Sequence, residues 1–256
     1  MQYEKKLEAD VVVVGGGVSG VVAAIAAARS GSKTILVHDR SVLGGNASSE
    51  IRVHIGGATE HGYHYDARET GIIEEIRLET AVRDPYNTYS WIDTCLYTKC
   101  VEEPNLQVLL DTYINKAFVE EIKGKGKYEK KINKIEGLRA GSETKIVIKG
   151  KMFLDGTGHG TLGTLAGADF RYGQESREEF GESLAPEQKT ENVLGASILF
   201  KAEDLGRGPI EFTPPSWAVE FTSEKLQKAG KSVSGKSDNH GRYWHNDTSG
   251  WWWVEL

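Results

Sequence analysis

The chain has 256 residues, of which 39% are hydrophobic and 27% are charged, a balance typical of a globular protein with its own core. Its net charge of -6 at pH 7 argues against a general nucleic-acid binder and against a protein that binds anionic membranes. No apolar run approaches the roughly 20 residues of a membrane-spanning helix, and the charged start lacks an apolar signal segment, so we expect a cytoplasmic protein.

A strand, a glycine-rich loop, a helix and a second strand open the chain. Four consecutive valines within residues 10–14 predict a buried parallel strand. The loop G-G-G-V-S-G follows at residues 15–20, and the small and apolar residues of 18–29 predict a helix. A second short strand is predicted at residues 34–37. In this context the G-x-G-x-x-G pattern strongly indicates dinucleotide binding, the alternative being a glycine-rich turn without a ligand.

Each glycine of this pattern has a task at a phosphate site. Gly15 permits the tight turn after the strand, Gly17 lets a pyrophosphate approach the backbone, and Gly20 lets the helix pack closely on the sheet. Val18 and Ser19 stand at the start of the helix, where unpaired N–H groups and the positive end of the helix dipole bind phosphate. We predict that these five residues bind the cofactor.

An acidic side chain is expected at the end of the second strand, where it would accept hydrogen bonds from the adenosine ribose. Asp39 lies at this position, and its carboxylate would repel a 2′-phosphate, which disfavours NADP. Arg40 follows it, and we expect this side chain to face the pyrophosphate or the solvent.

The segment after Arg40 distinguishes FAD from NAD. Gly44-Gly45-Asn46 brings a second pair of glycines to the pyrophosphate, and here the chain resembles the FAD-dependent oxidoreductases of glutathione-reductase-type fold. Residues 43–58 resemble more closely a bacterial family of FAD-dependent oxidoreductases. The resemblance implies FAD as the cofactor. Many relatives carry the ribose-binding acid where this chain has His38, so either Asp39 binds the ribose after a small shift or His38 replaces it.

Later strands extend the resemblance. Residues 106–110, 114–122, 132–138 and 145–148 predict alternating strands and turns, and residues 152–154 predict a further strand that runs into a Thr-Gly motif. A β-meander followed by such a strand is how the superfamily completes its FAD domain, although His159 stands where relatives commonly have aspartate. The resemblance adds four predicted cofactor-binding residues: Ile114, Gly156, Thr157 and Gly158.

The sequence therefore predicts an α/β fold with two domains. Residues 1–170 are expected to form a Rossmann-like FAD-binding domain with a central parallel sheet, a β-meander and helices, and residues 171–256 the start of a mixed α+β substrate domain. Residues 59–104 are expected to be a helical insertion that covers part of the cofactor, with a helix at 67–83 capped by Asp66. Another helix is expected to begin within residues 165–168.

The last part of the chain predicts strands at residues 193–200, 210–212 and 251–256, with a helix or long turn at 217–230. The final W-W-W-V-E-L is apolar, whereas chain ends are usually polar and loose. Relatives continue beyond this point to a segment that contacts the ribityl chain and the flavin, so we expect the sequence to be a piece of a longer protein.

Candidate chemistry lies between the second glycine pair and residue 64. Asn46, Ser48 and Ser49 suit phosphate, ribityl or flavin edges, and capping or turn formation is the alternative. Arg52 could bind a substrate carboxylate or stabilise the charge of reduced flavin. His54 could act as an acid or base, or carry covalently attached FAD. For both residues the alternative is a surface role or a role in the core.

Metal and thiol chemistry are not predicted. Cys95 and Cys100 have neither the spacing of a zinc knuckle nor that of a redox dithiol, and they are interpreted as reduced, partly buried thiols. His61 and His64 belong to a polar and aromatic cluster that could line a pocket, but they lack a third metal ligand.

The function predicted from the sequence is an FAD-dependent oxidoreductase that transfers a hydride between a small-molecule substrate and the flavin. One alternative is a non-catalytic or truncated FAD- or ADP-binding fragment. The other is a non-redox protein of thiazole-synthase type, whose residues after the second glycine pair match residues 46–52 poorly.

Overall fold

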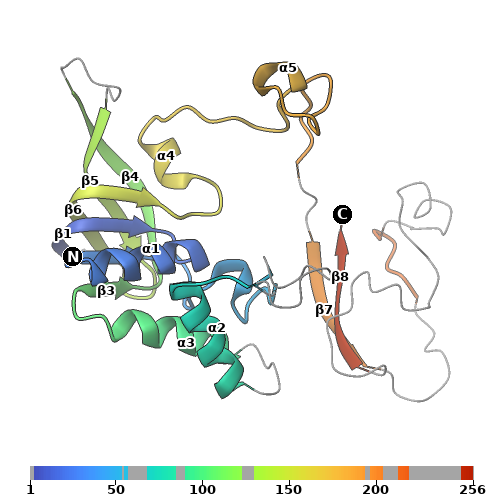
Figure 1. Ribbon diagram of the computed structural model, residues 1–256, viewed down its shortest axis with the longest axis horizontal. Helices are drawn as coiled ribbons and strands as arrows, with labels where there is room; N and C mark the ends of the chain where they lie inside the picture. The colour runs from blue at the N-terminus through green and yellow to red at the C-terminus, as the bar shows by residue number, and fades with distance from the viewer. Residues whose placement is uncertain are drawn as a thin grey trace. The chain divides into compact units, whose positions relative to one another are not determined.

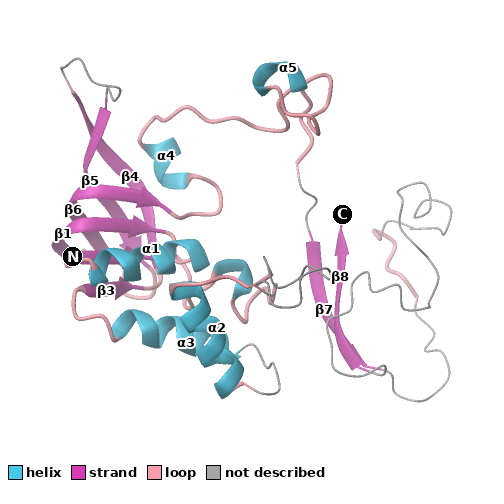
Figure 2. Ribbon diagram, viewed as in Figure 1, coloured by secondary structure: helices cyan, strands magenta, loops and turns pink. Residues whose placement is uncertain are grey.

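The computed structural model describes residues 3–53, 55–56, 68–84, 90–122, 130–193, 197–203, 213–218 and 249–255. The chain forms two compact units, Met1–Arg171 and Tyr172–Leu256. In the first unit a strand–helix–strand segment and two further helices precede a run of four strands (Figures 1 and 2). The assignment of the two units as an FAD-binding domain and a substrate domain stays a prediction.

Four parallel strands form the centre of the first unit. β1 (Glu4–Val14), α1 (Val18–Arg29) and β2 (Thr34–Val37) are the predicted strand–helix–strand unit. β1 pairs in parallel with β2 and with β6 (Thr144–Asp155), and β2 pairs in parallel with β3 (Leu106–Leu109). The sheet order β3-β2-β1-β6-β5-β4 therefore places the carboxyl ends of β2, β1 and β6 side by side. The predicted α/β fold with a central parallel sheet is confirmed.

Two antiparallel strands, β4 (Thr112–Glu121) and β5 (Lys130–Arg139), complete the sheet and form the predicted meander with β6. The prediction of separate strands at 145–148 and 152–154 was wrong, because β6 is continuous. Gly150 lies inside it rather than between two strands. A Cβ at Gly150 would come within 2.8 Å of the Val12 side chain and 2.9 Å of Phe153, so close packing explains this glycine.

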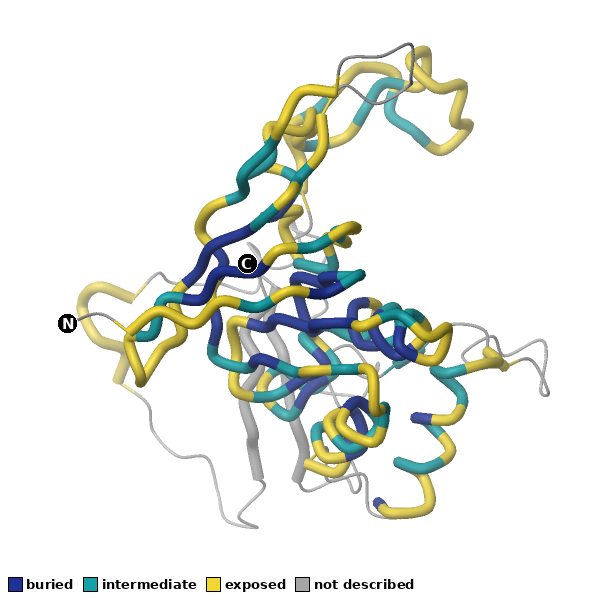
Figure 3. Tube along the Cα trace, turned by 90° about the vertical axis from the view of Figure 1, so that its left-hand side faces the viewer, coloured by how far each residue is buried: buried dark blue, intermediate teal, exposed yellow. Residues whose placement is uncertain are grey.

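Two apolar clusters cover the two faces of the sheet, and Figure 3 shows the buried segments running along its strands. Val12 and Val14 of β1 belong to one cluster, which includes residues of the meander and of α4 (Thr161–Leu165). Val13 belongs to the other, which includes α1 and the two helices that follow β2. Burial on both faces explains the unbroken run of valines.

The helices after β2 differ from the sequence prediction. α2 spans Ile72–Arg83 and not 67–83, because residues 68–70 are not helical and Gly71 has a φ of 75° at its start. α3 (Ser90–Val101) was not predicted, although its buried Ile92, Cys95, Leu96 and Cys100 recur with helical spacing. The predicted helix start at 165–168 was also wrong, since α4 ends at Leu165 and Gly167, with a φ of 72°, follows it.

The second unit contains a short helix, α5 (Arg177–Phe180), and an antiparallel pair, β7 (Ser197–Glu203) and β8 (Ser249–Glu255). These strands agree in position with the predictions at 193–200 and 251–256, shifted by a few residues. The predicted strand at 210–212 and most of the segment 217–230 lie outside the described residues. Among the residues that are described, no helix combines the length and the apolar character needed to cross a membrane.

Candidate functional site

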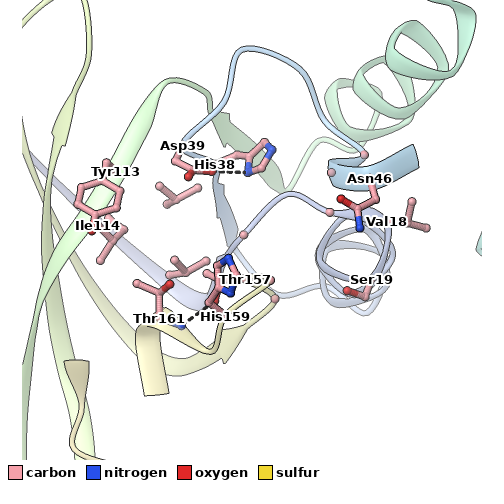
Figure 4. A pocket seen from close by; sticks show the side chains of 18 of the residues that line it. Val18, Ser19, His38, Asp39, Asn46, Tyr113, Ile114, Thr157, His159 and Thr161 are labelled. Atoms are coloured by element: carbon pink, nitrogen blue, oxygen red, sulfur yellow. Dashed lines mark hydrogen bonds and ion pairs between the residues drawn. The ribbon is translucent and has the colours of Figure 1, made fainter. Parts of the chain in front are cut away.

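A cavity of about 480 Å³ lies at the carboxyl ends of β1, β2 and β6, beside the start of β4. Open α/β sheets bind ligands in a crevice at this edge, and small-molecule pockets occupy roughly 300–1,000 Å³. Figure 4 shows Tyr113 and Ile114 at one end of the cavity and Val18 and Asn46 at the other, with Thr157 and His159 between them.

Gly15 and Gly20 shape the turn from β1 into α1. Gly15 has a φ of 101°, and its N–H donates to the carbonyl of Val37 at 2.8 Å. A Cβ on Gly15 would overlap the backbone of Gly156, and a Cβ on Gly20 would overlap the carbonyl of Gly15. Both glycines are therefore required by packing between backbone segments, independently of any ligand.

Gly17 differs from these two glycines. Its φ of -63° and ψ of 171° suit any residue, and a Cβ there would have no heavy atom nearer than the Gly156 carbonyl oxygen, 4.0 Å away. Gly17 precedes the first turn of α1, whose N–H groups lack intrahelical acceptors and which contains no acidic residue. The absence of a side chain keeps this helix end accessible from the cavity, as an anion site requires.

A hydrogen-bonded turn follows β6 on the opposite wall. The Asp155 carboxylate accepts bonds from the N–H and hydroxyl of Thr157, at 2.9 and 2.6 Å, and from the N–H of Gly163 at 2.8 Å. The Thr157 hydroxyl in turn accepts a bond from the N–H of Thr161 at 2.8 Å. Gly156 N–H donates to the Val14 carbonyl at 2.7 Å, which fixes this turn against the end of β1.

His38, the last residue before Asp39, is buried with 6% of its surface exposed. Its Nδ1 accepts a hydrogen bond from the Gly16 N–H at 3.0 Å and lies 3.3 Å from Oδ1 of Asp39. Burial lowers the pKa of His38 below its ordinary value, and Asp39 opposes this effect. Burial thus favours the neutral ring, whose Nδ1 acts as an acceptor for the glycine loop.

The side chains of Asp39 and Arg40 have different surroundings. The Asp39 side chain is 55% exposed and lines the cavity, near the end formed by Tyr113 and Ile114. Arg40 does not line the cavity, and its Nε donates to Oε2 of Glu50 at 2.6 Å.

The second pair of glycines, Gly44 and Gly45, contacts the glycine loop of residues 15–20. Gly44 has a φ of 116°, its N–H donates to the Gly16 carbonyl at 2.8 Å, and it forms a bridge with Gly17. Gly45 begins a short 3-10 helix, η1 (Gly45–Ala47), and Asn46 within it is exposed at the cavity.

The loop after η1, residues 48–53, is held by a residue of α3. The Asp93 carboxylate accepts a bond from the Ser49 N–H at 2.8 Å and a second, shorter one from the Ser49 hydroxyl. The buried Ser48 hydroxyl donates to the Gly45 carbonyl at 2.7 Å. Arg52 adopts a φ of 66°, unusual for a residue with a side chain, and its Nε donates to the Ser49 carbonyl at 2.8 Å.

The structure brings most of the predicted cofactor-binding residues to one cavity, which is lined by Gly15, Gly17, Val18, Ser19, His38, Asp39, Gly44, Gly45, Asn46, Ile114, Gly156, Thr157 and Gly158. Five other predicted residues do not line it, namely Gly20, Arg40, Ser48, Ser49 and Arg52. His54, His61 and His64 lie outside the described residues.

Sequence reasoning missed several lining residues: Val14, Val37, Ala47, Val53, Thr112, Tyr113 and Thr161, with His159 noted only as a departure from the family. Val14 and Val37 end parallel strands, so the position of ligand crevices could have identified them. Thr112 and Tyr113 were missed because the strand was predicted to begin at Ile114.

The two cysteines lie apart from this cavity, on α3. Both are free and buried, as interpreted from their spacing, and burial raises the pKa of Cys100 to about 12. Within the described ranges, no group of three or more His, Cys, Asp or Glu side chains has the geometry to hold a metal ion.

Several solved structures resemble the chain at low identity. L-proline dehydrogenase from P. horikoshii is 18% identical, with a TM-score of 0.34, 62% of this chain covered and 24% of that chain. THI4 from Thermovibrio ammonificans is 20% identical, with a TM-score of 0.42 and coverages of 71% and 76%. The myxobacterial chondrochloren halogenase CndH, an FAD-dependent halogenase, is 14% identical, with a TM-score of 0.41 and coverages of 59% and 38%. The chain thus spans less than half of the proline dehydrogenase and of the halogenase.

No curated protein matches the chain. The sequence profile of the FAD dependent oxidoreductase family, however, matches residues 10–252. This range includes the glycine loop of residues 15–20, the second pair of glycines, the meander and the Thr-Gly turn. This chain belongs to the FAD dependent oxidoreductase family, and FAD is its cofactor.

Proposed function

We propose that the chain binds FAD along the cavity described above and that the flavin exchanges a hydride with a small-molecule substrate. The observation that carries this proposal is the cavity itself. A Cβ at Gly17 would meet no heavy atom nearer than 4.0 Å, yet the residue is a glycine, and this leaves the N-terminus of α1 accessible from the cavity. Family membership supports a flavin redox function in general.

The adenosine half of FAD would occupy the end formed by Asp39, Tyr113 and Ile114. The exposed Asp39 carboxylate is an acceptor suited to both ribose hydroxyls. Tyr113 is 56% exposed at the cavity and offers an aromatic face to the adenine, beside the apolar Ile114.

The pyrophosphate would lie against Gly17, Val18 and Ser19, where backbone N–H groups and the α1 dipole compensate its charge. Gly158 suits the facing wall, because a Cβ there would meet nothing within 4 Å. Arg40 is engaged by Glu50, so we assign the charge compensation chiefly to the backbone.

The flavin half would extend past Gly45 and Asn46 toward the loop of residues 48–53. When bound, the flavin supplies the redox chemistry, and the protein orients it and excludes water. Arg52 is our candidate for binding a substrate carboxylate or for stabilising negative charge, because unusual backbone conformations concentrate at functional sites. His54 stays a prediction.

The test is FAD binding by the purified chain, followed by the flavin absorbance bands and by titration. Gly17→Leu fills the pyrophosphate approach while its backbone geometry tolerates a side chain, so we expect a folded protein with at least 100-fold weaker FAD binding. Ala26→Leu adds the same side chain to the exposed part of α1 and should bind FAD like the natural chain. Unchanged FAD affinity in a folded Gly17→Leu protein would contradict the site.

Hydride transfer needs a second experiment. Anaerobic mixing of the FAD-bound chain with panels of small amines, hydroxy acids and sugars should bleach the flavin absorbance for one class. Binding of ADP with the same affinity as FAD, and no bleaching, would favour the nucleotide-binding fragment.

A further inference from the structure

His38 stands between two groups that require opposite protonation of the same atom. Nδ1 accepts the Gly16 N–H at 3.0 Å, which requires an unprotonated nitrogen. The same Nδ1 lies 3.3 Å from Oδ1 of Asp39, a contact that becomes a hydrogen bond only when Nδ1 carries a proton. A single proton therefore decides which partner the ring can bind.

The backbone around His38 makes it a junction between the cavity walls. Its N–H donates to the Leu109 carbonyl at 2.9 Å, and its carbonyl accepts from the Thr112 N–H at 2.8 Å. Its ring packs so closely on Gly16 that a Cβ there would lie 2.7 Å from Cγ of His38. The ring thus contacts the glycine loop, while the backbone is anchored to the wall that begins β4.

The charged groups that act on the ring are few in the described part of the chain. Burial, the largest influence, and Arg40 disfavour its protonation, whereas Asp39, Glu50 and a hydrogen bond to the backbone of Val42 favour it. Glu50 and Arg40 are paired with each other at 2.6 Å, so their opposing effects largely cancel. A protonated ring therefore has two partners, the backbone of Val42 and the Asp39 carboxylate, and Asp39 is the one that lies within 3.3 Å of Nδ1.

We propose that His38 is a positioning residue: its neutral ring holds the glycine loop in the conformation that receives the pyrophosphate, and its protonation transfers Nδ1 from Gly16 to Asp39 and releases FAD. This inference rests on the proposed function, because it takes the glycine loop and Asp39 as contacts of the bound dinucleotide.

Protonation weakens binding through two changes. The Gly16 N–H loses its acceptor, which loosens the loop beside Gly17. The Asp39 carboxylate becomes engaged by the imidazolium and is no longer free to accept bonds from the ribose. The exposed His159 also lines the cavity, at the Thr-Gly turn.

The first experiment needs no cofactor. Nitrogen-15 NMR of the histidine rings, with His38 assigned by its loss in His38→Gln, should show an unprotonated Nδ1 and a protonated Nε2 at about pH 8. On acidification the His38 signals should move to the doubly protonated form together with a shift of the Gly16 amide. An Nδ1-protonated neutral ring, or a Gly16 amide that does not respond, would overturn the positioning role.

The second experiment measures the FAD dissociation constant from about pH 8 to about pH 5.5. We expect affinity to fall with acid, by up to about tenfold per pH unit, the limit for one coupled proton. His38→Gln, whose side-chain oxygen can accept from Gly16 without titrating, should bind FAD with little dependence on pH. His159→Asn should keep the acid-side loss.

The outcomes separate the two proposals. Thermal unfolding first shows whether the His38→Gln protein is folded. If it is folded and its FAD affinity depends on pH as that of the natural chain does, the switch is overturned while FAD binding is left intact. Failure of the natural chain to bind FAD at any pH would overturn the proposed function and the release step together, and the NMR result would then decide whether His38 holds the loop.

Discussion

The two loops that border the cavity near α1, residues 15–20 and residues 48–53, hold their shapes in different ways. The first is fixed by glycines that fit backbone against backbone, as at Gly15 and Gly156. The second is fixed by a side chain from another element, since Asp93 on α3 accepts hydrogen bonds from the N–H and the hydroxyl of Ser49. The first shape follows from local sequence, and the second depends on where a distant helix packs.

This difference has a functional meaning. A loop whose form is dictated by backbone contacts suits the invariant part of a dinucleotide, the pyrophosphate. A loop held by a side chain of a separate helix can be altered by substitutions in that helix, so under the proposed function we expect it to border the part of the site that varies with the substrate.

Gly20→Val should give the largest effect, because its Cβ would overlap the Gly15 carbonyl at the junction of β1 and α1. We expect a loss of more than about 3 kcal/mol in the free energy of unfolding and no FAD binding. Urea unfolding followed by circular dichroism measures it, with Ala26→Val on the same helix as the control. Near-natural stability in Gly20→Val would show that the first loop is less constrained than its contacts imply.

Asp93→Ala tests the second loop. The lost bonds involve a charged acceptor, so we expect a destabilisation of about 1.5–3 kcal/mol together with weaker FAD binding. Ser49→Ala removes the hydroxyl part of the same contact. A double-mutant cycle should therefore show strong non-additivity between the two substitutions. Additive effects would mean that Asp93 stabilises α3 alone and does not hold the loop.

The pH dependence of stability tests the contact between His38 and the first loop. Because the folded-state pKa of His38 is lowered, the unfolded chain binds a proton more readily as the pH falls below its own pKa of about 6.5. Stability without FAD should be full above that pH and should decrease as the pH falls toward the folded-state pKa. Urea midpoints of the natural chain and His38→Gln should diverge in this range. If the urea midpoints of the two proteins changed in parallel with pH, His38 would be protonated to the same extent in the folded and the unfolded chain.

Arg29→Ala should have the smallest effect. Arg29 on α1 forms a two-pronged ion pair with Glu75 of α2 at 2.9 Å and a second pair with Glu103 at 2.7 Å, all near the surface. Such pairs contribute about 1 kcal/mol or less, and the loss should shrink in high salt. Thermal unfolding at two salt concentrations measures it, with Arg83→Ala as a surface pair within one helix. A loss of several kcal/mol in the free energy of unfolding would show that the packing of α2 and α3 against α1 depends on the ion pairs of Arg29.

The start of the fold could be predicted closely because its signals are local, although β1 begins at Glu4 and not at residue 10. The bounds of α1 and β2 agree with the prediction, since four valines, a glycine loop and a run of small residues leave few alternatives. α3 was missed because its Thr, Tyr, Trp and Cys residues have weak helix propensity, which obscured its apolar spacing. β6 was divided in the prediction because a glycine inside a strand resembles a break unless its packing partner is known.

The site shows the same limit. Glycine positions, strand ends and the family resemblance together predicted thirteen of the residues that line the cavity. No local motif could have indicated that Asp93 holds Ser49, because that contact joins segments brought together only by packing. Nor could the sequence decide between His38 and Asp39 as the ribose partner. In the structure His38 is enclosed and Asp39 is exposed at the cavity, which supports the proposal that Asp39 binds the ribose.

Because Gly15 packs against Gly156, the glycine loop can close only after a much later part of the chain has been made. The strand and helix that carry the glycine loop are made before the meander, whereas the backbone of Gly156 that closes the loop is made only after it. The hydrogen bond from Gly156 to Val14 closes a long stretch of chain, and such closures are slow steps in folding. A nascent chain that has not yet reached the end of β6 therefore carries the glycine loop without the backbone contacts that close it.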